Sequence, residues 1–146
     1  MIAIDTNLLV YAHRPELPAH EVALKLLRSL PARGGLFGLP WPCAHEFLAV
    51  VTNPRIFRDP TPSPMALAAA RALADSESIR MLGEGAGYLD HLTEQVTRGG
   101  VRGGMVHDAR IAAICRYHGV RELWSADRDF GRFPDLRVVN PLIREP

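Results

Sequence analysis

Two acidic residues stand directly after short apolar runs that predict buried strands. Asp5 follows the run 2–4, and Asp127 comes just after the run 123–125. In open parallel sheets, ligands bind in a crevice beyond the carboxyl ends of the strands, so an acid at that end is placed to serve a ligand. A simpler alternative stays open for both residues, because an aspartate before a helix also caps the first turn.

Two more acids, Glu46 and Asp108, lie on predicted helices among apolar neighbours. The side chains three and four residues away from Glu46 are all apolar, and Asp108 begins a stripe that continues through Ile111 and Cys115. A carboxylate on an inward helix face is expensive unless it has a partner. The alternatives are a partly exposed Glu46 and an Asp108 that complements the helix dipole, an effect of about 0.3–1 kcal/mol.

Together these four carboxylates predict a metal site at one end of the sheet. Two like charges about 4 Å apart repel by about 4 kcal/mol at an effective dielectric of about 20, so clustered acids hold either protons or a cation. Oxygen ligands without a cysteine or histidine cluster favour Mg²⁺ or Mn²⁺, as one or two ions, over zinc. Such an ion can activate water and stabilise charge on a phosphodiester oxygen.

The elements that must position these acids alternate between strand and helix. Apolar runs predict short strands at 2–4, 36–39, 79–82, 123–125 and 137–139. Helical patterning predicts helices from residue 8 and over 16–30, 41–51, 65–73, 86–97 and 105–117. We expect Pro31 to end the second of these helices. Such alternation predicts an α/β fold with a parallel sheet covered on both faces.

The length and composition fit a single cytoplasmic domain over residues 1–146. Hydrophobic residues make up 47% of the chain and charged residues 23%, the balance of a globular protein. No apolar run reaches the roughly 18 residues needed to span a bilayer, and residues 1–5 lack the pattern of a secretory signal. Cys43 and Cys115 fit neither a disulfide framework nor a zinc site, so we expect two reduced thiols in the core.

The charge of the chain is close to balanced, but its basic residues are almost all arginine. The net charge is +1, and Lys25 is the single lysine among 17 basic residues. Arginine suits phosphate recognition because its planar fork makes paired hydrogen bonds, although a GC-rich genome also produces this composition. If four of the 16 acids hold metal, 17 basic groups face 12 acidic ones, and that surface can attract RNA.

The order and spacing of the four acids resemble the PIN-domain family, and within it the VapC toxins of bacterial toxin–antitoxin pairs. The similar segments are 4–7, 44–47, 108–113 and 125–130, so the resemblance covers essentially the whole chain. Ser125 stands where a threonine is commoner in the family, and it keeps the hydroxyl. The last segment offers both Asp127 and Asp129 as the fourth acid. We prefer Asp127, which is nearer the strand end.

The resemblance implies a three-layer α/β/α fold with a short, Rossmann-like parallel sheet, and an endoribonuclease that depends on Mg²⁺ or Mn²⁺. It implies structured RNA substrates such as tRNA or rRNA loops, a homodimer, and a partner antitoxin that neutralises the toxin. The metal ligands would be Asp5, Glu46, Asp108 and Asp127. Hydrogen bonds from Thr6, Asn7 and Ser125 would support these ligands.

Several other residues are given no functional role at this point. His45 and His107 each precede a site acid, but adjacent helical residues point about 100° apart, so we expect them to be structural or solvated. Trp41 and Trp124 are interpreted as packing residues rather than as surfaces for base stacking. Five arginines in predicted loops could contact phosphate, although solvated side chains are the simpler interpretation: Arg14, Arg55, Arg58, Arg98 and Arg102.

Two other functions compete with RNA hydrolysis. A phosphate-accepting signalling domain also clusters acids and Mg²⁺ at strand ends, but it needs a lysine on a late strand, and Lys25 falls in an early helix. A PIN-like domain that has lost activity could serve only as a binding module. The presence of all four acids argues against that second alternative.

Overall fold

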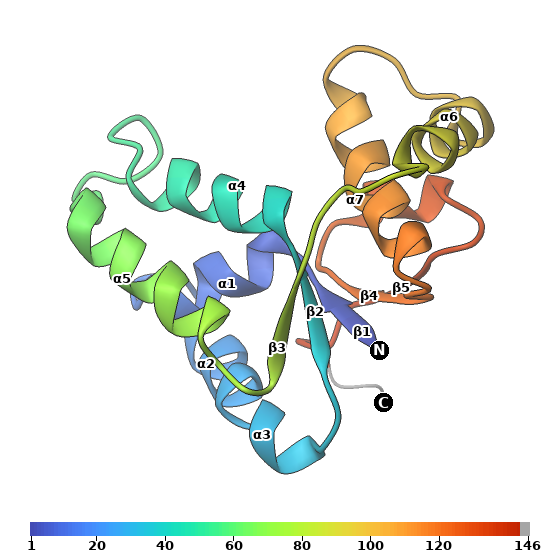
Figure 1. Ribbon diagram of the computed structural model, residues 1–146. Coiled ribbons are helices and arrows are strands. Elements are labelled where there is room, and N and C mark those ends of the chain that lie inside the picture. The colour runs from blue at the N-terminus through green and yellow to red at the C-terminus, as the bar shows by residue number, and fades with distance from the viewer. Residues whose placement is uncertain (144–146) are drawn as a thin grey trace.

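The sheet has five parallel strands in the order β3-β2-β1-β4-β5 in the computed structural model, which describes residues 1–143 (Figure 1). The strands are β1 (Ile2–Ile4), β2 (Phe37–Pro40), β3 (Ile79–Leu82), β4 (Glu122–Trp124) and β5 (Arg137–Val139). In the central pair, Ile4 of β1 lies opposite Trp124 of β4. The residues that directly follow β1 and β4 therefore lie side by side at the carboxyl edge of the sheet.

Helices cover both faces of this sheet. The longer ones are α1 (Thr6–His13), α2 (His20–Arg28), α4 (Trp41–Val51), α5 (Ser63–Ala74), α6 (Tyr88–Gly99) and α7 (Val106–Tyr117). In Figure 1, α1, α2, α4 and α5 lie on one side of the sheet, and α6 and α7 lie on the other. The predicted three-layer α/β/α architecture is thus confirmed.

The direction in which successive strands are added to the sheet reverses beside β1. The first three strands add to the sheet in one direction, and the chain then crosses over through α6 and α7 to place β4 on the free side of β1. Parallel connections are right-handed, so this reversal puts the two sets of helices on opposite faces. A crevice opens at such a switch point, beyond the carboxyl ends of β1 and β4.

The structure corrects several predicted boundaries. The helix expected over 16–30 is shorter, as α2, and a separate turn of helix, α3 (Leu30–Arg33), follows it. Pro31 sits in the first turn of α3, where a missing N–H costs nothing, rather than after a helix end. For the same reason α5 begins at Ser63, ahead of the predicted residue 65, with Pro64 in its first turn. Ser125 lies just outside β4.

The core predictions are largely confirmed, with one exception. Cys43 and Cys115 are buried free thiols, and Trp124 is only 7% exposed. Trp41 was expected to pack inside but is 44% exposed, because it opens α4 at the rim of the sheet. Among residues 1–143, no helix combines the length and the apolar character that a membrane crossing requires.

Arg14 is a buried anchor and not the solvated loop residue that the sequence indicated. Its side chain donates to the Asp59 carbonyl at 2.7 Å and to the Thr61 hydroxyl at 3.0 Å. Its guanidinium also lies 4.2 Å from the centroid of the Phe57 ring. These contacts hold the loop between α4 and α5 against the end of α1.

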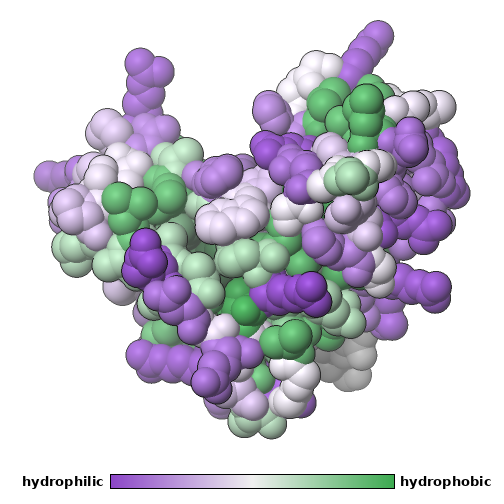
Figure 2. Space-filling view, viewed as in Figure 1, coloured by the Kyte–Doolittle hydropathy of each residue, from purple (hydrophilic) through white to green (hydrophobic). Residues whose placement is uncertain are grey.

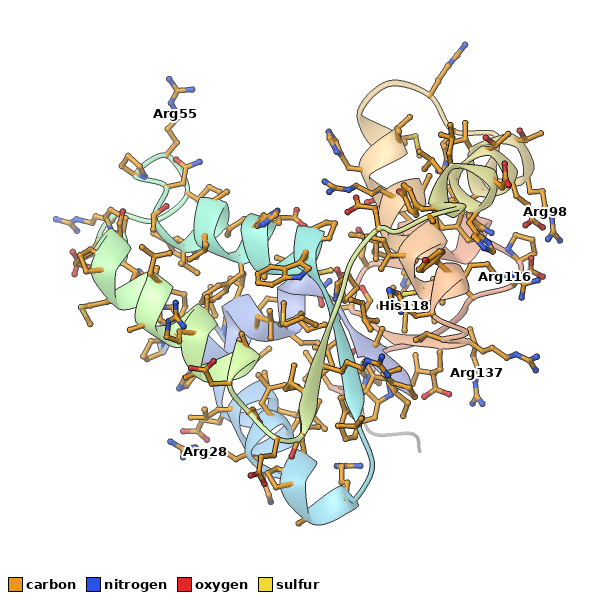
Figure 3. All side chains as sticks on the ribbon, in the orientation of Figure 1. Arg28, Arg55, Arg98, Arg116, His118 and Arg137 are labelled. Atoms are coloured by element: carbon orange, nitrogen blue, oxygen red, sulfur yellow. The ribbon has the colours of Figure 1, made fainter. Side chains whose placement is uncertain are left out.

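We expect Arg14→Ala to destabilise the fold by about 2–4 kcal/mol, because the change removes the donor to the Asp59 carbonyl and to the buried Thr61 hydroxyl and also removes the packing on Phe57. Urea denaturation followed by circular dichroism measures this loss. Arg55→Ala is the matched control, since Arg55 points outward from the same loop (Figure 3). Equal denaturation midpoints for the two variants would show that Arg14 does not anchor the loop.

Candidate metal centre at the carboxyl edge of the sheet

Asp5 leaves β1 at the switch point and is almost fully buried. Its backbone N–H donates to the Trp124 carbonyl at 3.0 Å, which extends the β1–β4 pairing by one residue. The residue holds the N-cap position of α1, yet its side chain makes no capping hydrogen bond. The alternative in which Asp5 serves only as a helix cap is therefore wrong.

The Asp5 carboxylate is instead fixed by side chains from three segments. Its Oδ2 atom accepts a hydrogen bond from the Ser125 hydroxyl at 2.6 Å and another from the Asn7 amide at 2.8 Å. The Cys43 thiol, a weak donor, lies 3.6 Å from Oδ1. One oxygen is thus held by two strong donors, and the other has only a weak one.

Asn7 and Ser125 connect the start of α1 to the loop after β4. The Asn7 amide nitrogen donates to the Ser125 hydroxyl at 3.0 Å, and the Asn7 carbonyl oxygen accepts from the Ala126 N–H at 3.1 Å. The Ser125 hydroxyl also accepts from the Asp127 N–H at 2.9 Å. The same hydrogen-bond network therefore sets the position of Asp5 and the backbone of Asp127.

Glu46 joins the site through Thr6. The Thr6 hydroxyl donates to the Glu46 Oε2 atom at 2.8 Å, across 40 residues of sequence. Glu46 is exposed, and so is its neighbour Ala49. Of the apolar neighbours that predicted an inward glutamate, Cys43 lies in the core, but Pro42, Ala49 and Val50 border open cavities. This corrects the reasoning and keeps Glu46 at the site.

Asp108 and Asp127 complete the group. Asp108 lies in the first turn of α7 and is half-buried. Asp127 caps the short 3-10 helix Arg128–Arg132 by accepting from the Asp129 N–H at 2.8 Å. Asp127 therefore acts as the predicted cap and is also half-buried at the site, whereas Asp129 is exposed.

All four predicted acids line one cavity of about 260 Å³ at the switch point. Asp5 and Asp127 come from the ends of the two central strands, and Glu46 and Asp108 come from helices on opposite faces of the sheet. Thr6 and Asn7 also line this cavity. The structure therefore brings together acids that lie far apart in the chain.

The remaining wall of the cavity is apolar or aromatic and was not predicted. It consists of Val10, Tyr11, Val50, Ile111 and Phe130. The signal for four of them was present in the sequence. Val10 and Tyr11 stand three and four residues after Asn7, Val50 stands four residues after Glu46, and Ile111 stands three after Asp108, so each shares a helix face with a site residue.

Burial and the neighbouring charges raise the pKa of two of the site acids, Asp5 and Asp108. Burial raises the pKa of Asp5 to about 6, with a further rise from the charge of Glu46, although the hydrogen bond from Ser125 acts in the opposite direction. The pKa of Asp108 is also raised, first by burial and then by the charges of Asp127, Asp129 and Glu46. A cation in the cavity would relieve both effects.

The donor set suits a hard divalent cation. Within residues 1–143, no three acidic, histidine or cysteine side chains stand close enough together to form a ready-made metal site. Asp5 is fixed by its hydrogen bonds, however, and Glu46, Asp108 and Asp127 line the same cavity. Mg²⁺ keeps several waters and needs only a few carboxylates, so an arrangement of acids around a shared cavity fits it. The buried thiol of Cys43 has a pKa raised by burial, which disfavours thiolate ligation of a softer metal.

Comparison with known proteins finds relatives that cover nearly the whole chain. The PIN domain family model matches residues 2–136. Ribonuclease VapC48 of Mycobacterium tuberculosis is 32% identical over 137 residues, which are 94% of each chain. The solved structure of M. tuberculosis VapC20, described as a sarcin-ricin loop cleaving toxin, has a TM-score of 0.68 at 22% identity and covers 94% of this chain and 99% of its own. VapBC2 of Rickettsia felis, solved on a promoter DNA fragment, has a TM-score of 0.65 at 17% identity, with coverage of 95% and 98%.

We expect Asp5→Asn to raise the melting temperature of the metal-free protein by several degrees at pH 7.5. The raised pKa of Asp5 means that protonation stabilises the fold at low pH, and this contribution of about 3 kcal/mol is lost as the pH rises through about 6. Asparagine keeps the accepting oxygen and removes the charge. Thermal scans of both proteins at pH 4 and pH 7.5 measure the difference, which should shrink at pH 4.

The exposed Asp75, changed to Asn, is the matched control for this measurement. Mg²⁺ should raise the melting temperature of the unchanged protein and of Asp75→Asn, but not of Asp5→Asn. A lower melting temperature for Asp5→Asn than for the unchanged chain at pH 7.5 would contradict the claim that the charge of Asp5 destabilises the metal-free fold.

Proposed function

The chain belongs to the PIN-domain family, and on that premise we propose that it is a Mg²⁺- or Mn²⁺-dependent endoribonuclease that hydrolyses RNA phosphodiester bonds. The observation that carries the proposal is the convergence of four acids, from two strand ends and two opposed helices, on one cavity. A binding module without activity would have no reason to keep charges that destabilise the fold.

The ion would be held by Asp5, Glu46, Asp108 and Asp127. When bound, it would supply a Lewis acid that activates water and offsets charge on the phosphodiester. Asp5 is pre-positioned by Asn7 and Ser125, and these fixed hydrogen bonds reduce the cost of orienting a ligand.

Other residues of the site orient the Glu46 carboxylate and limit the access of water to the acids. Thr6 directs the Glu46 carboxylate toward the cavity through its hydroxyl. The apolar wall formed by Val10, Val50 and Phe130 limits the water around the acids, which strengthens their interaction with a bound cation.

The named relatives support a proposal for the biological setting. We propose a cytoplasmic toxin that acts on structured RNA, such as a tRNA or rRNA loop, and is neutralised by an antitoxin protein. The relative VapC48 is named a ribonuclease, and the structural neighbour VapC20 is described as a toxin that cleaves the sarcin-ricin loop. The Rickettsia neighbour is a VapBC assembly, which supports a protein partner, and we extend the proposal to a homodimer. Sequencing the 5′ ends of cellular RNA after induced expression identifies the RNA and the cut site.

We expect Asp5→Asn to lower Mg²⁺-dependent RNA cleavage at least about 100-fold while the fold survives, because the fixed ligand loses its charge. Cleavage of a labelled RNA pool with Mg²⁺ and with EDTA measures this, and circular dichroism checks the fold. Asp75→Asn, prepared in parallel under nuclease-free conditions, should cleave like the unchanged chain. Equal cleavage by Asp5→Asn and Asp75→Asn would refute the proposed site.

Comparing Asp127→Asn with Asp129→Asn identifies the fourth acid. We expect the larger loss of cleavage at Asp127, which lines the cavity and whose backbone is held by Ser125. Asparagine at 127 still accepts the Asp129 N–H, so the 3-10 helix should keep its cap. The same RNA assay measures both variants, and a milder loss at Asp127 would assign the role to Asp129 instead.

A further inference from the structure

A second cavity, of about 350 Å³, continues from the acid cavity along the carboxyl edge of the sheet. The two cavities share Glu46, Asp108 and Ile111. Figure 2 shows the face of the molecule hollowed between the part that carries α4 and the part that carries α7. A polynucleotide with a phosphodiester at the acids can therefore continue from the first cavity into the second.

The two walls of the second cavity come from opposed helices. α4 contributes His45, and α7 contributes His107 and Arg110. Both histidines are exposed, and each directly precedes a site acid, so the turn of the helix points it away from the acid cavity and into the second one. The walls thus carry hydrogen-bond donors beside an apolar base that includes Ile111.

Arg110 is held in place at this wall. Its Nε atom donates to the Glu84 carboxylate at 2.5 Å, just after β3, and this hydrogen bond lowers the pKa of Glu84. A guanidinium has five N–H donors, so a single bond through Nε leaves others that can reach a phosphate oxygen. The ion pair fixes the direction of those donors before any ligand arrives.

Trp41 supplies an aromatic surface beside His45, which lines the second cavity. It is 44% exposed, and its ring centroid lies 5.9 Å from that of His45 with the planes only 31° apart. A Cβ added at Gly83 would lie 3.3 Å from the Trp41 ring, so the backbone after β3 supports the indole from one side. A large ring that is held in place and left exposed is suited to stacking against a nucleobase.

From this arrangement we infer that the second cavity binds the nucleotide next to the scissile phosphate, with its base stacked on Trp41 and its outer phosphate contacted by Arg110 and His107. The inference rests on the proposed nuclease function and adds a substrate-positioning site to it. An RNA strand fits better than a protein segment, because the groove pairs an aromatic face with phosphate donors and joins the acids directly.

The first test compares cleavage of RNA with cleavage of methyl p-nitrophenyl phosphate, a diester that has no nucleobase. We expect Trp41→Ala to lower the ratio of RNA to diester kcat/KM about tenfold, mainly through KM, and Trp41→Phe to restore most of it. Leu89→Ala, which truncates another exposed apolar side chain, on α6, is the control. A ratio for Trp41→Ala equal to that of Leu89→Ala would overturn the inference.

The second test needs no catalysis. Trp124 is buried, so a short single-stranded RNA added to the inactive Asp5→Asn protein should quench mainly Trp41 fluorescence. The quenching should disappear in Asp5→Asn/Trp41→Phe, and persistence there would overturn the assignment. If the unchanged chain cleaves no RNA, the proposed function fails. If cleavage depends on Asp5 but Trp41 variants alter only neutralisation by an antitoxin, the groove binds protein and the nucleotide site fails alone.

Discussion

The pairing of β1 with β4 is the constraint on which the site depends. Because Ile4 lies opposite Trp124, the next residues along each strand meet, and the Ser125 hydroxyl reaches the Asp5 carboxylate at 2.6 Å. Asn7 also donates to Asp5, and it ties the two segments together through two hydrogen bonds, one to the Ser125 hydroxyl and one from the Ala126 N–H. This junction is also where strand order reverses, so helices from both faces of the sheet border it and each can add one acid.

The cavity brings together groups that repel one another, and the rest of the fold must sustain this arrangement. Burial and the charge of Glu46 raise the pKa of Asp5, while the hydrogen bond from Ser125 partly offsets the rise. A small set of hydrogen bonds therefore holds the Asp5 carboxylate in position. This placement lowers the stability of the fold, and the packing of the core offsets the loss. The proposed cation converts that repulsion into attraction, which links the stability of the fold to the binding of the metal.

Local sequence patterns predicted the strands and the acids at their ends, since an apolar run followed by aspartate is a signal within a few residues. They failed where distant contacts decide the outcome. Arg14 is buried because a loop 45 residues away supplies its acceptors, and no local pattern shows this. Trp41 was expected inside, but α4 begins at the edge of the sheet, where the indole meets solvent. Glu46 was placed correctly for an imperfect reason, since most of its apolar neighbours border open cavities.

The residues that meet at the junction are far apart in the sequence, and this determines when the site forms during folding. Thr6 and Glu46 are 40 residues apart, and Asp5 and Ser125 are 120 apart, so closing the junction requires nearly the whole chain. Contacts of such long range form late, after the local helices. A polypeptide still emerging during its own synthesis would hold Asp5 and Glu46 without Asp127. If the chain is a nuclease, it therefore remains inert toward the translation machinery until its final strands have docked.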